Sequence, residues 1–176
     1  MIDFVLRSST DLIYGRGKES RVGALIRDFG GTRVLIHHSG EPFVLPLIRR
    51  VKEYLDQAGL AWVELGGVVP NPRIELVYQG IALCRREKVD FILAVGGGSV
   101  IDSAKAIGLG AVYDGDVWDI YDGRVKQQAS IPSGVISTFA GTGSEATFGS
   151  VITKGRLKRG IEDPDDHVLI RPKFVI

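Results

Sequence analysis

The sequence predicts an α/β domain with a mainly parallel sheet and helices on both of its faces. Short apolar stretches alternate with longer stretches in which apolar residues recur every three or four positions, as in strands alternating with amphipathic helices. The stretch Val34 to Ile36 is continuously apolar, which is typical of a parallel strand covered on both sides. The 176 residues, 44% of them hydrophobic, suffice for one domain with its own core. These observations indicate one Rossmann-like domain over residues 1–176.

The first half of the chain is predicted to begin with an edge hairpin and to continue with strands and helices in alternation. Two short apolar segments flank a polar run, which predicts the two strands and the turn of the hairpin. Gly30 and Gly31 end the first helix as a C-terminal cap would. The predicted elements are strands at Phe4 to Leu6 and Leu12 to Tyr14, a helix from Glu19 to Phe29, a strand at Val34 to Ile36, a helix at Val44 to Ala58 and a strand at Leu60 to Leu65.

The second half repeats the alternation and then becomes less regular. Its last four residues resemble the beginning of a strand that has been cut short. The predicted elements are a helix at Pro72 to Glu87, a strand at Asp90 to Val95, a helix at Val100 to Leu109, a short helix or turn at Asp114 to Tyr121, and strands at Gly134 to Thr138, Phe148 to Thr153 and Lys173 to Ile176.

Composition argues against several classes of partner. The 22 basic and 21 acidic side chains give a net charge of +1, so no sequence-wide field would attract nucleic acid or an anionic membrane. Cys84 is the only cysteine, which excludes an intrachain disulfide and fits a reducing, cytoplasmic setting. No stretch has the length of a signal peptide's apolar core or of a membrane span. A small-molecule partner is therefore expected.

The central motif is a glycine run between a strand and a helix. Gly96, Gly97, Gly98 and Ser99 follow the apolar strand directly. In doubly wound sheets a helix N-terminus at such a place offers free N–H groups to a phosphate, and glycines allow the backbone to approach it closely. Ser99 and Asp102 also have the spacing of a capping box. The alternative is a tight strand–helix connection that binds nothing.

A second polar motif, Thr138 to Glu145, follows the strand that ends near Ser137. Hydroxyls and glycines at the end of a neighbouring strand can line the same crevice and bind the ribose or phosphate oxygens of a cofactor. The alternative is a turn in which Ser144 caps a short helix. Two such loops in one sheet strengthen the prediction of a dinucleotide site.

Together these motifs resemble the cofactor loops of the iron-containing alcohol dehydrogenases, in the dehydroquinate synthase-like superfamily. The residues that carry the resemblance are the run from Gly96 to Ile107 and the run from Thr138 to Glu145, with Pro70-Asn71-Pro72 upstream. The resemblance covers nearly the whole chain and only the N-terminal, nucleotide-binding domain of the family.

The resemblance implies roles for individual residues. Gly96, Gly97, Gly98 and Ser99 would meet the pyrophosphate, and Asp102 would lie near the nicotinamide and the substrate, as the one catalytic candidate. Lys105, three residues after Asp102 on the same helix face, is expected either to pair with Asp102 or to be solvated. Lys158 lies where several members of the family carry a lysine near the cofactor. Further cofactor contacts are expected from Asn71, Thr138 and Thr142.

Metal ligation is not expected from this chain. In the family, an aspartate and three histidines of a helical C-terminal domain hold the divalent metal, iron or zinc, and that domain is absent here. His37 and His38 are adjacent on a predicted strand, so their side chains should point to opposite faces. His167 lies near Asp163, Asp165 and Asp166, a run that is more typical of a solvated loop.

The resemblance thus implies the NAD(P)-binding domain of an enzyme that interconverts an alcohol and an aldehyde. The isolated chain is expected to bind the cofactor without catalysing the reaction. Alternatives are a glycerol dehydrogenase, a maleylacetate reductase, a hydroxyacid-oxoacid transhydrogenase or a stand-alone nucleotide-binding module. Ser39, where NAD-dependent members carry aspartate, favours NADP, although Glu41 could restore the repulsion of a 2′-phosphate. The N-terminal hairpin is expected to pair with a second copy in a homodimer.

Overall fold

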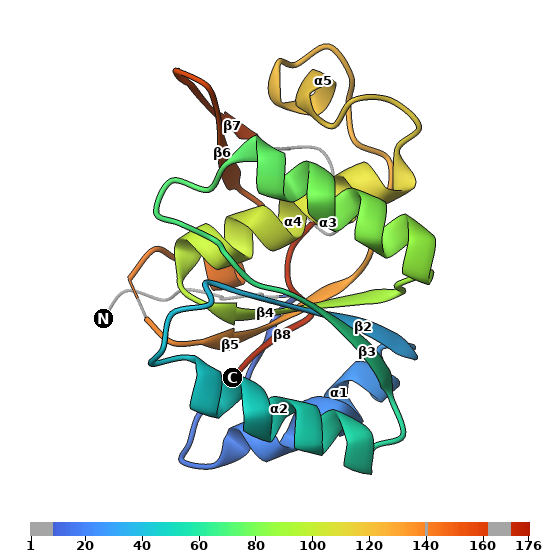
Figure 1. The fold of residues 1–176 in the computed structure, drawn as a ribbon, viewed down its shortest axis with the longest axis vertical. Coiled ribbons are helices and arrows are strands. Elements are labelled where there is room, and N and C mark those ends of the chain that lie inside the picture. Colours follow the sequence, from blue (N-terminus) through green and yellow to red (C-terminus); the bar gives the residue numbers. More distant parts are fainter. Residues whose placement is uncertain (1–8, 140, 162–169) are drawn as a thin grey trace, which may run out of the picture.

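The computed structural model describes residues 9–139, 141–161 and 170–176, which form an α/β domain around a parallel sheet. The six strands lie in the order β1-β8-β5-β4-β2-β3, and every neighbouring pair is parallel. Figure 1 shows the sheet as the middle layer of the molecule. The strands are β1 (Asp11–Leu12), β2 (Arg33–His38), β3 (Ala61–Leu65), β4 (Phe91–Gly96), β5 (Ser133–Ser137) and β8 (Phe174–Val175).

Helices cover both faces of this sheet, as the sequence predicts. Helices α1 and α2 lie on one face, and α3 and α4 lie on the other (Figure 1). The long helices are α1 (Val22–Asp28), α2 (Leu45–Gln57), α3 (Ile74–Glu87) and α4 (Gly98–Val112), and the short ones are η1 (Lys18–Arg21), α5 (Trp118–Tyr121) and η2 (Ser144–Ala146).

The core follows from the alternation of side chains along the central strands. Val34 and Ile36 of β2 pack in the apolar cluster beneath α1 and α2, whereas Leu35 packs in the cluster beneath α3 and α4. Strand β4 is buried along its whole length, which explains its continuously apolar sequence. From Val100 to Gly110 in α4, every residue except Asp102 is buried. The central helix therefore exposes one carboxylate near its beginning.

A two-stranded antiparallel hairpin, β6 (Ser150–Lys154) and β7 (Leu157–Ile161), stands apart from the main sheet. Its first strand lies against the helical layer, where the backbone N–H of Thr153 donates to the carbonyl of Pro72 at 2.9 Å. The sequence predicts β6 but not β7. Strand β7 carries two basic residues and is exposed along its first four positions, so it lacks the apolar pattern by which strands are recognised.

The N-terminal edge is described only in part. Strand β1 lies at the end of the sheet and pairs in parallel with β8, which confirms an edge strand near Leu12. The expected partner strand, Phe4 to Leu6, lies outside the described residues. Among the described residues, no helix has both the length and the hydropathy that crossing a membrane requires.

Candidate cofactor-binding site

The carboxyl ends of β2, β4 and β5 meet at one edge of the sheet, and a groove of about 400 Å³ opens there. Ser39, directly after β2, lines one part of the groove, and Thr138, directly after β5, lines another. The glycine run 96–98 and Ser99 lie between them, where β4 passes into α4. This is the position at which doubly wound sheets bind their ligands.

Helix α4 begins without a side-chain cap. Its N-cap residue is Gly97, whose backbone is extended (φ −93°, ψ −167°), and no acidic residue lies in the first turn. The predicted capping box is wrong: Ser99 already lies inside the helix, and the carboxylate of Asp102 accepts hydrogen bonds from other partners. The first N–H groups of α4 and the positive end of its dipole are therefore available to an anion in the groove.

Two neighbouring glycines at this helix start have different surroundings. A Cβ atom on Gly98 would lie 2.7 Å from Cγ2 of Thr142, so Gly98 is required by the packing of the chain itself. A Cβ atom on Gly97 would meet nothing closer than Cβ of Phe139 at 3.4 Å. Gly97 is therefore the place where the backbone is open to a ligand.

A second hollow, of about 490 Å³, adjoins the groove. Asp102 and Thr142 line it, together with residues of η2, β6 and β7. Thr142, which lines this hollow, packs against Gly98, which lines the first groove, so the two hollows lie on either side of this contact at the beginning of α4. The N-terminus of α4 therefore lies near both hollows.

Asp102 is held by several hydrogen bonds at the wall of the second hollow. Its Oδ1 accepts from the Ser144 hydroxyl at 2.5 Å, and its Oδ2 accepts from the backbone N–H of Val151 at 3.1 Å. The Ser150 hydroxyl donates to the backbone carbonyl of Asp102 at 2.9 Å. Burial raises the pKa of Asp102 above its ordinary value, and the Ser144 hydrogen bond and the charge of Lys105 act in the opposite direction.

Lys105 is buried, with 2% of its surface exposed, so the expectation that it is solvated is wrong. Its Nζ donates to the backbone carbonyls of Ser144, Thr147 and Gly149 at 2.7–2.8 Å and reaches the Ser144 hydroxyl at 3.2 Å. Within the described part of the chain, Nζ makes no ion pair with Asp102. Burial lowers the pKa of Lys105 to about 8, and the charges of Asp102 and Glu145 raise it.

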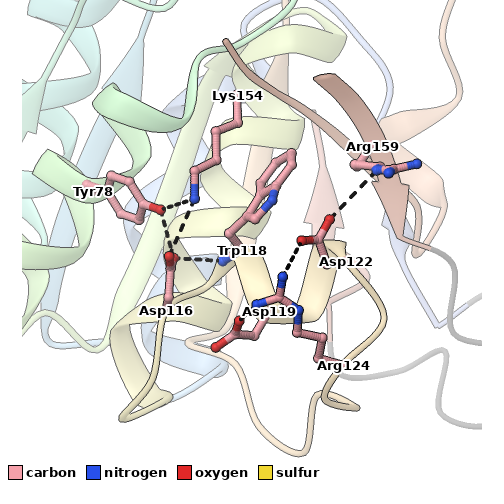
Figure 2. A network of polar contacts seen from close by, with 8 residues as sticks. All are labelled: Tyr78, Asp116, Trp118, Asp119, Asp122, Arg124, Lys154 and Arg159. Carbon is pink, nitrogen blue, oxygen red and sulfur yellow. Dashed lines mark hydrogen bonds and ion pairs between the residues drawn. The ribbon is translucent and has the colours of Figure 1, made fainter. Parts of the chain in front are cut away.

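The β6–β7 hairpin, which forms a wall of the second hollow, is tied to the helical layer by polar contacts (Figure 2). Lys154 of β6 lies 3.5 Å from the carboxylate of Asp116, which also accepts a hydrogen bond of 2.7 Å from the hydroxyl of Tyr78 in α3. Arg159 of β7 lies 3.7 Å from the carboxylate of Asp122, just after α5. These contacts connect both strands of the hairpin to the segment that contains α5.

Eight of the nine residues predicted to contact the cofactor line one of the two hollows, and Asn71 lines neither. Asn71 has a left-handed backbone (φ 57°), and its Oδ1 accepts a hydrogen bond of 2.7 Å from Lys158. The first groove contains Ser39, Gly96, Gly97, Gly98, Ser99 and Thr138, and the second hollow contains Asp102 and Thr142.

Several residues of the site were not predicted from the sequence. Ser144 belongs to the second motif, where helix capping was the alternative given for its hydroxyl and a contact with Asp102 was not predicted. Ser150 and Val151 carry no local signal, because their contacts with Asp102 span almost 50 positions of the chain. The burial of Lys105 also depends on this distant segment.

The two adjacent histidines have separate structural environments, as predicted. His37 is fully buried and contacts the Ser103 hydroxyl of α4 through Nε2, whereas His38 contacts Glu64 on the neighbouring strand. In the described ranges, no group of three His, Cys, Asp or Glu side chains could hold a metal ion. The cluster near His167 lies outside those ranges.

Comparison with known proteins gives consistent matches. The family model described as iron-containing alcohol dehydrogenase matches residues 9–176. A probable NADH-dependent butanol dehydrogenase of Bacillus subtilis is 42% identical over 178 residues, which cover 100% of this chain and 45% of that protein. An NADPH-dependent aldehyde reductase of Escherichia coli is 34% identical over 158 residues, 88% of this chain and 40% of that protein.

A solved structure matches as well. The crystal structure of NADH-dependent butanol dehydrogenase A from Thermotoga maritima superposes with a TM-score of 0.90 at 33% identity, covering 98% of this chain and 43% of that one. The chain thus spans less than half the length of these relatives. With the family match extending from the first described strand to the last, the chain belongs to the iron-containing alcohol dehydrogenase family.

Proposed function

We propose that residues 1–176 are the nicotinamide-dinucleotide-binding domain of an enzyme that interconverts an alcohol and an aldehyde. The observation that carries this proposal is the uncapped N-terminus of α4, which lies between two hollows near the carboxyl edge of the sheet. A dinucleotide has its phosphates at the centre and a nucleoside at each end, so its shape and charge match this arrangement.

Different residues of the site would contact different parts of the cofactor. The N–H groups of α4 at Gly98 and Ser99 would bind the pyrophosphate, beside the open backbone of Gly97. Ser39 would lie at the ribose of the adenosine half, in the first groove. Asp102 and Thr142 would lie at the nicotinamide half, in the second hollow. This division is supported by the position of each side chain on either side of the helix start.

When bound, the nicotinamide accepts the hydride that an alcohol loses as it becomes an aldehyde, or supplies it in the reverse direction. The contribution of this chain is to hold the nicotinamide ring in a fixed position in the second hollow. Asp102 is the candidate for contact with the nicotinamide ring, because it is the one carboxylate of α4 and is partly exposed. Its two hydrogen-bond donors fix the orientation of the carboxylate.

The remaining length of the enzyme would supply the substrate pocket and the metal. Among the described residues, no group of three His, Cys, Asp or Glu side chains could hold the metal. We propose, as the resemblance to the family implies, that one aspartate and three histidines of a helical C-terminal domain would hold the metal. The chain of 176 residues is therefore proposed to bind the cofactor without turning over substrate, in a cytoplasmic setting.

The choice between NAD and NADP is proposed to depend on two residues of the first groove. Ser39 cannot repel a 2′-phosphate, which by itself favours NADP. Glu41 lines the same groove two residues later, and its backbone N–H donates to the Ser39 hydroxyl at 3.3 Å. A carboxylate at this place restores the repulsion, and the relative with 42% identity is named NADH-dependent. These observations support NAD(H) as the preferred form, against the expectation from Ser39 alone.

The proposal is tested by calorimetric titration of the chain with NADH and with NADPH. Gly97→Val should weaken binding of both by more than about tenfold, because branched methyl groups would occupy the space of the phosphate. Ala61→Val is the control, since it adds two branched methyl groups at an exposed position at the other end of the strands. If Gly97→Val is folded and binds with wild-type affinity, the assignment of the pyrophosphate site is wrong.

A further inference from the structure

Three polar side chains form a continuous chain of contacts behind the second hollow. The Nζ of Lys105 lies 3.2 Å from the Ser144 hydroxyl, and that hydroxyl lies 2.5 Å from Oδ1 of Asp102. Lys105 and Ser144 are buried and Asp102 is partly exposed, and both Ser144 and Asp102 line the hollow. The function proposed above uses Asp102 and leaves the buried lysine without a role.

We propose that Lys105 is a positioning residue for Asp102, acting through the Ser144 hydroxyl and through the loop that carries it. This inference rests on the proposed function, in which Asp102 lies at the nicotinamide end of the site. Lys105 itself does not contact the cofactor. Its effect on the site is transmitted by Ser144.

The direction of each hydrogen bond follows from the chemistry of the groups. The three N–H groups of Lys105 face four acceptors, so the longest contact, to the Ser144 hydroxyl oxygen, shares an N–H with a carbonyl. In that contact the Ser144 oxygen accepts, because an ammonium has only donors. The single proton of the Ser144 hydroxyl is then directed to Oδ1 of Asp102, which as a carboxylate has only acceptors. The contact with Lys105 thus favours the orientation in which the hydroxyl donates a charge-assisted bond to the carboxylate.

Lys105 also shapes the loop that carries Ser144. The backbone carbonyls of Ser144, Thr147 and Gly149 converge on its Nζ at 2.7–2.8 Å, although this part of the chain contains only the short helix η2. An uncharged apolar side chain at position 105 would leave these carbonyls without a donor, at a cost of about 1–3 kcal/mol for each buried group. The loop geometry therefore depends on the ammonium.

The charged groups around this chain determine the expected titration. Asp102 interacts with Lys105 and Lys158, and Lys105 interacts with Asp102, Glu145 and Arg171. Burial raises the pKa of Asp102, while the Ser144 hydrogen bond and the charge of Lys105 lower it. Removal of either stabilising contact should therefore move the titration of Asp102 to higher pH.

The test is the pH titration of the Asp102 carboxyl carbon, followed by carbon-13 NMR in the 176-residue chain. Ser144→Ala should raise the midpoint by about one pH unit, and Ser144→Thr, which keeps the hydroxyl, should restore it. Lys105→Gln should raise the midpoint in the same direction. Lys52→Met, on the opposite helical layer, is the matched control and should leave it unchanged. An unchanged midpoint in folded Ser144→Ala or Lys105→Gln would overturn the proposal.

A measurement on the unsubstituted lysine covers the case in which the Lys105 variant does not fold. The wild-type Asp102 signal should show a second, smaller step near pH 8, where Lys105 loses its proton, and Ser144→Ala should reduce that step. Absence of the step, or a step of equal size in Ser144→Ala, contradicts transmission through the hydroxyl. NADH binding is measured separately, so a chain that titrates as expected but binds no dinucleotide would refute the proposed function and leave the positioning role intact.

Discussion

The pH dependence of stability should be dominated near pH 6 by one buried histidine. The Nδ1 of His37 lies 2.8 Å from the backbone carbonyl of Leu65, and its Nε2 lies 2.8 Å from the Ser103 hydroxyl. A carbonyl can only accept, so Nδ1 carries the proton, and neutral Nε2 accepts from Ser103. Burial lowers the pKa of His37 from 6.5 to about 4, although the Leu65 hydrogen bond opposes the shift.

The sign and size of the effect follow from this pKa. Between pH 6.5 and pH 4 the unfolded chain binds a proton at His37 that the folded chain does not bind, so acid favours unfolding. The stabilisation is complete above pH 6.5 and decreases as the pH falls toward 4. At about 1.4 kcal/mol for each pH unit, the loss is about 2 kcal/mol by pH 5.

Urea unfolding of the wild type and of His37→Asn at pH 7.5, 6.5, 5.5 and 5.0 measures this contribution. The asparagine amide can donate to the Leu65 carbonyl as Nδ1 does but does not titrate, so the variant should lose most of the pH dependence over this range. The pKa values of Asp90 and Asp116 are lowered, so their contributions are lost only at more acidic pH. Equal changes in the free energy of unfolding for the two chains would refute the assignment to His37.

Three further outcomes are expected. If Glu41 sets the cofactor preference, the wild type should bind NAD(H) more tightly than NADP(H) in calorimetry. Glu41→Gln should raise the affinity for NADP(H) by about tenfold, and Ser39→Asp should lower it. An unchanged ratio of NAD(H) to NADP(H) affinity in Glu41→Gln would contradict this. Lys154→Met should reduce the free energy of unfolding by less than about 1 kcal/mol, because the contact of Lys154 with Asp116 is partly exposed. The substitution should also speed amide hydrogen exchange in β6 and β7. Unaltered exchange would show that the contact does not hold the hairpin. Light scattering should detect a homodimer at micromolar concentration through the N-terminal edge, and a monomer would count against that pairing.

The parts of the fold that could be predicted from the sequence are those in which local pattern and burial agree. Strand β4 is apolar throughout because both faces are covered, and α2 buries Ile48, Val51 and Leu55 at helical spacing. Strand β7 could not be recognised, because its exposed, basic sequence owes its strand structure to pairing with β6. Sequence pattern reports burial, and an exposed hairpin strand has little of it.

In the candidate site too, the features set by consecutive residues could be predicted, and those set by long-range contacts could not. The glycine run at the beginning of α4 could be predicted because strand, turn and helix start are consecutive in the sequence. The capping box failed because a local spacing rule takes no account of competing partners: Asp102 instead binds Ser144 and Val151, which are 42 and 49 positions away. Long-range contacts of this kind leave no local signature.

Substitutions in the glycine run and in the second motif give different kinds of information. Gly97 has no packed neighbour that a methyl group would displace, so a change there alters the space for a ligand with little effect on the chain. Thr142 packs on Gly98, and Ser144 joins Lys105 to Asp102, so changes in the second motif alter the loop as well as the hollow. Loss of cofactor binding in a Gly97 variant is therefore direct evidence about the pyrophosphate. The same loss in a variant of the second motif becomes interpretable only when the titration of Asp102 is measured with it.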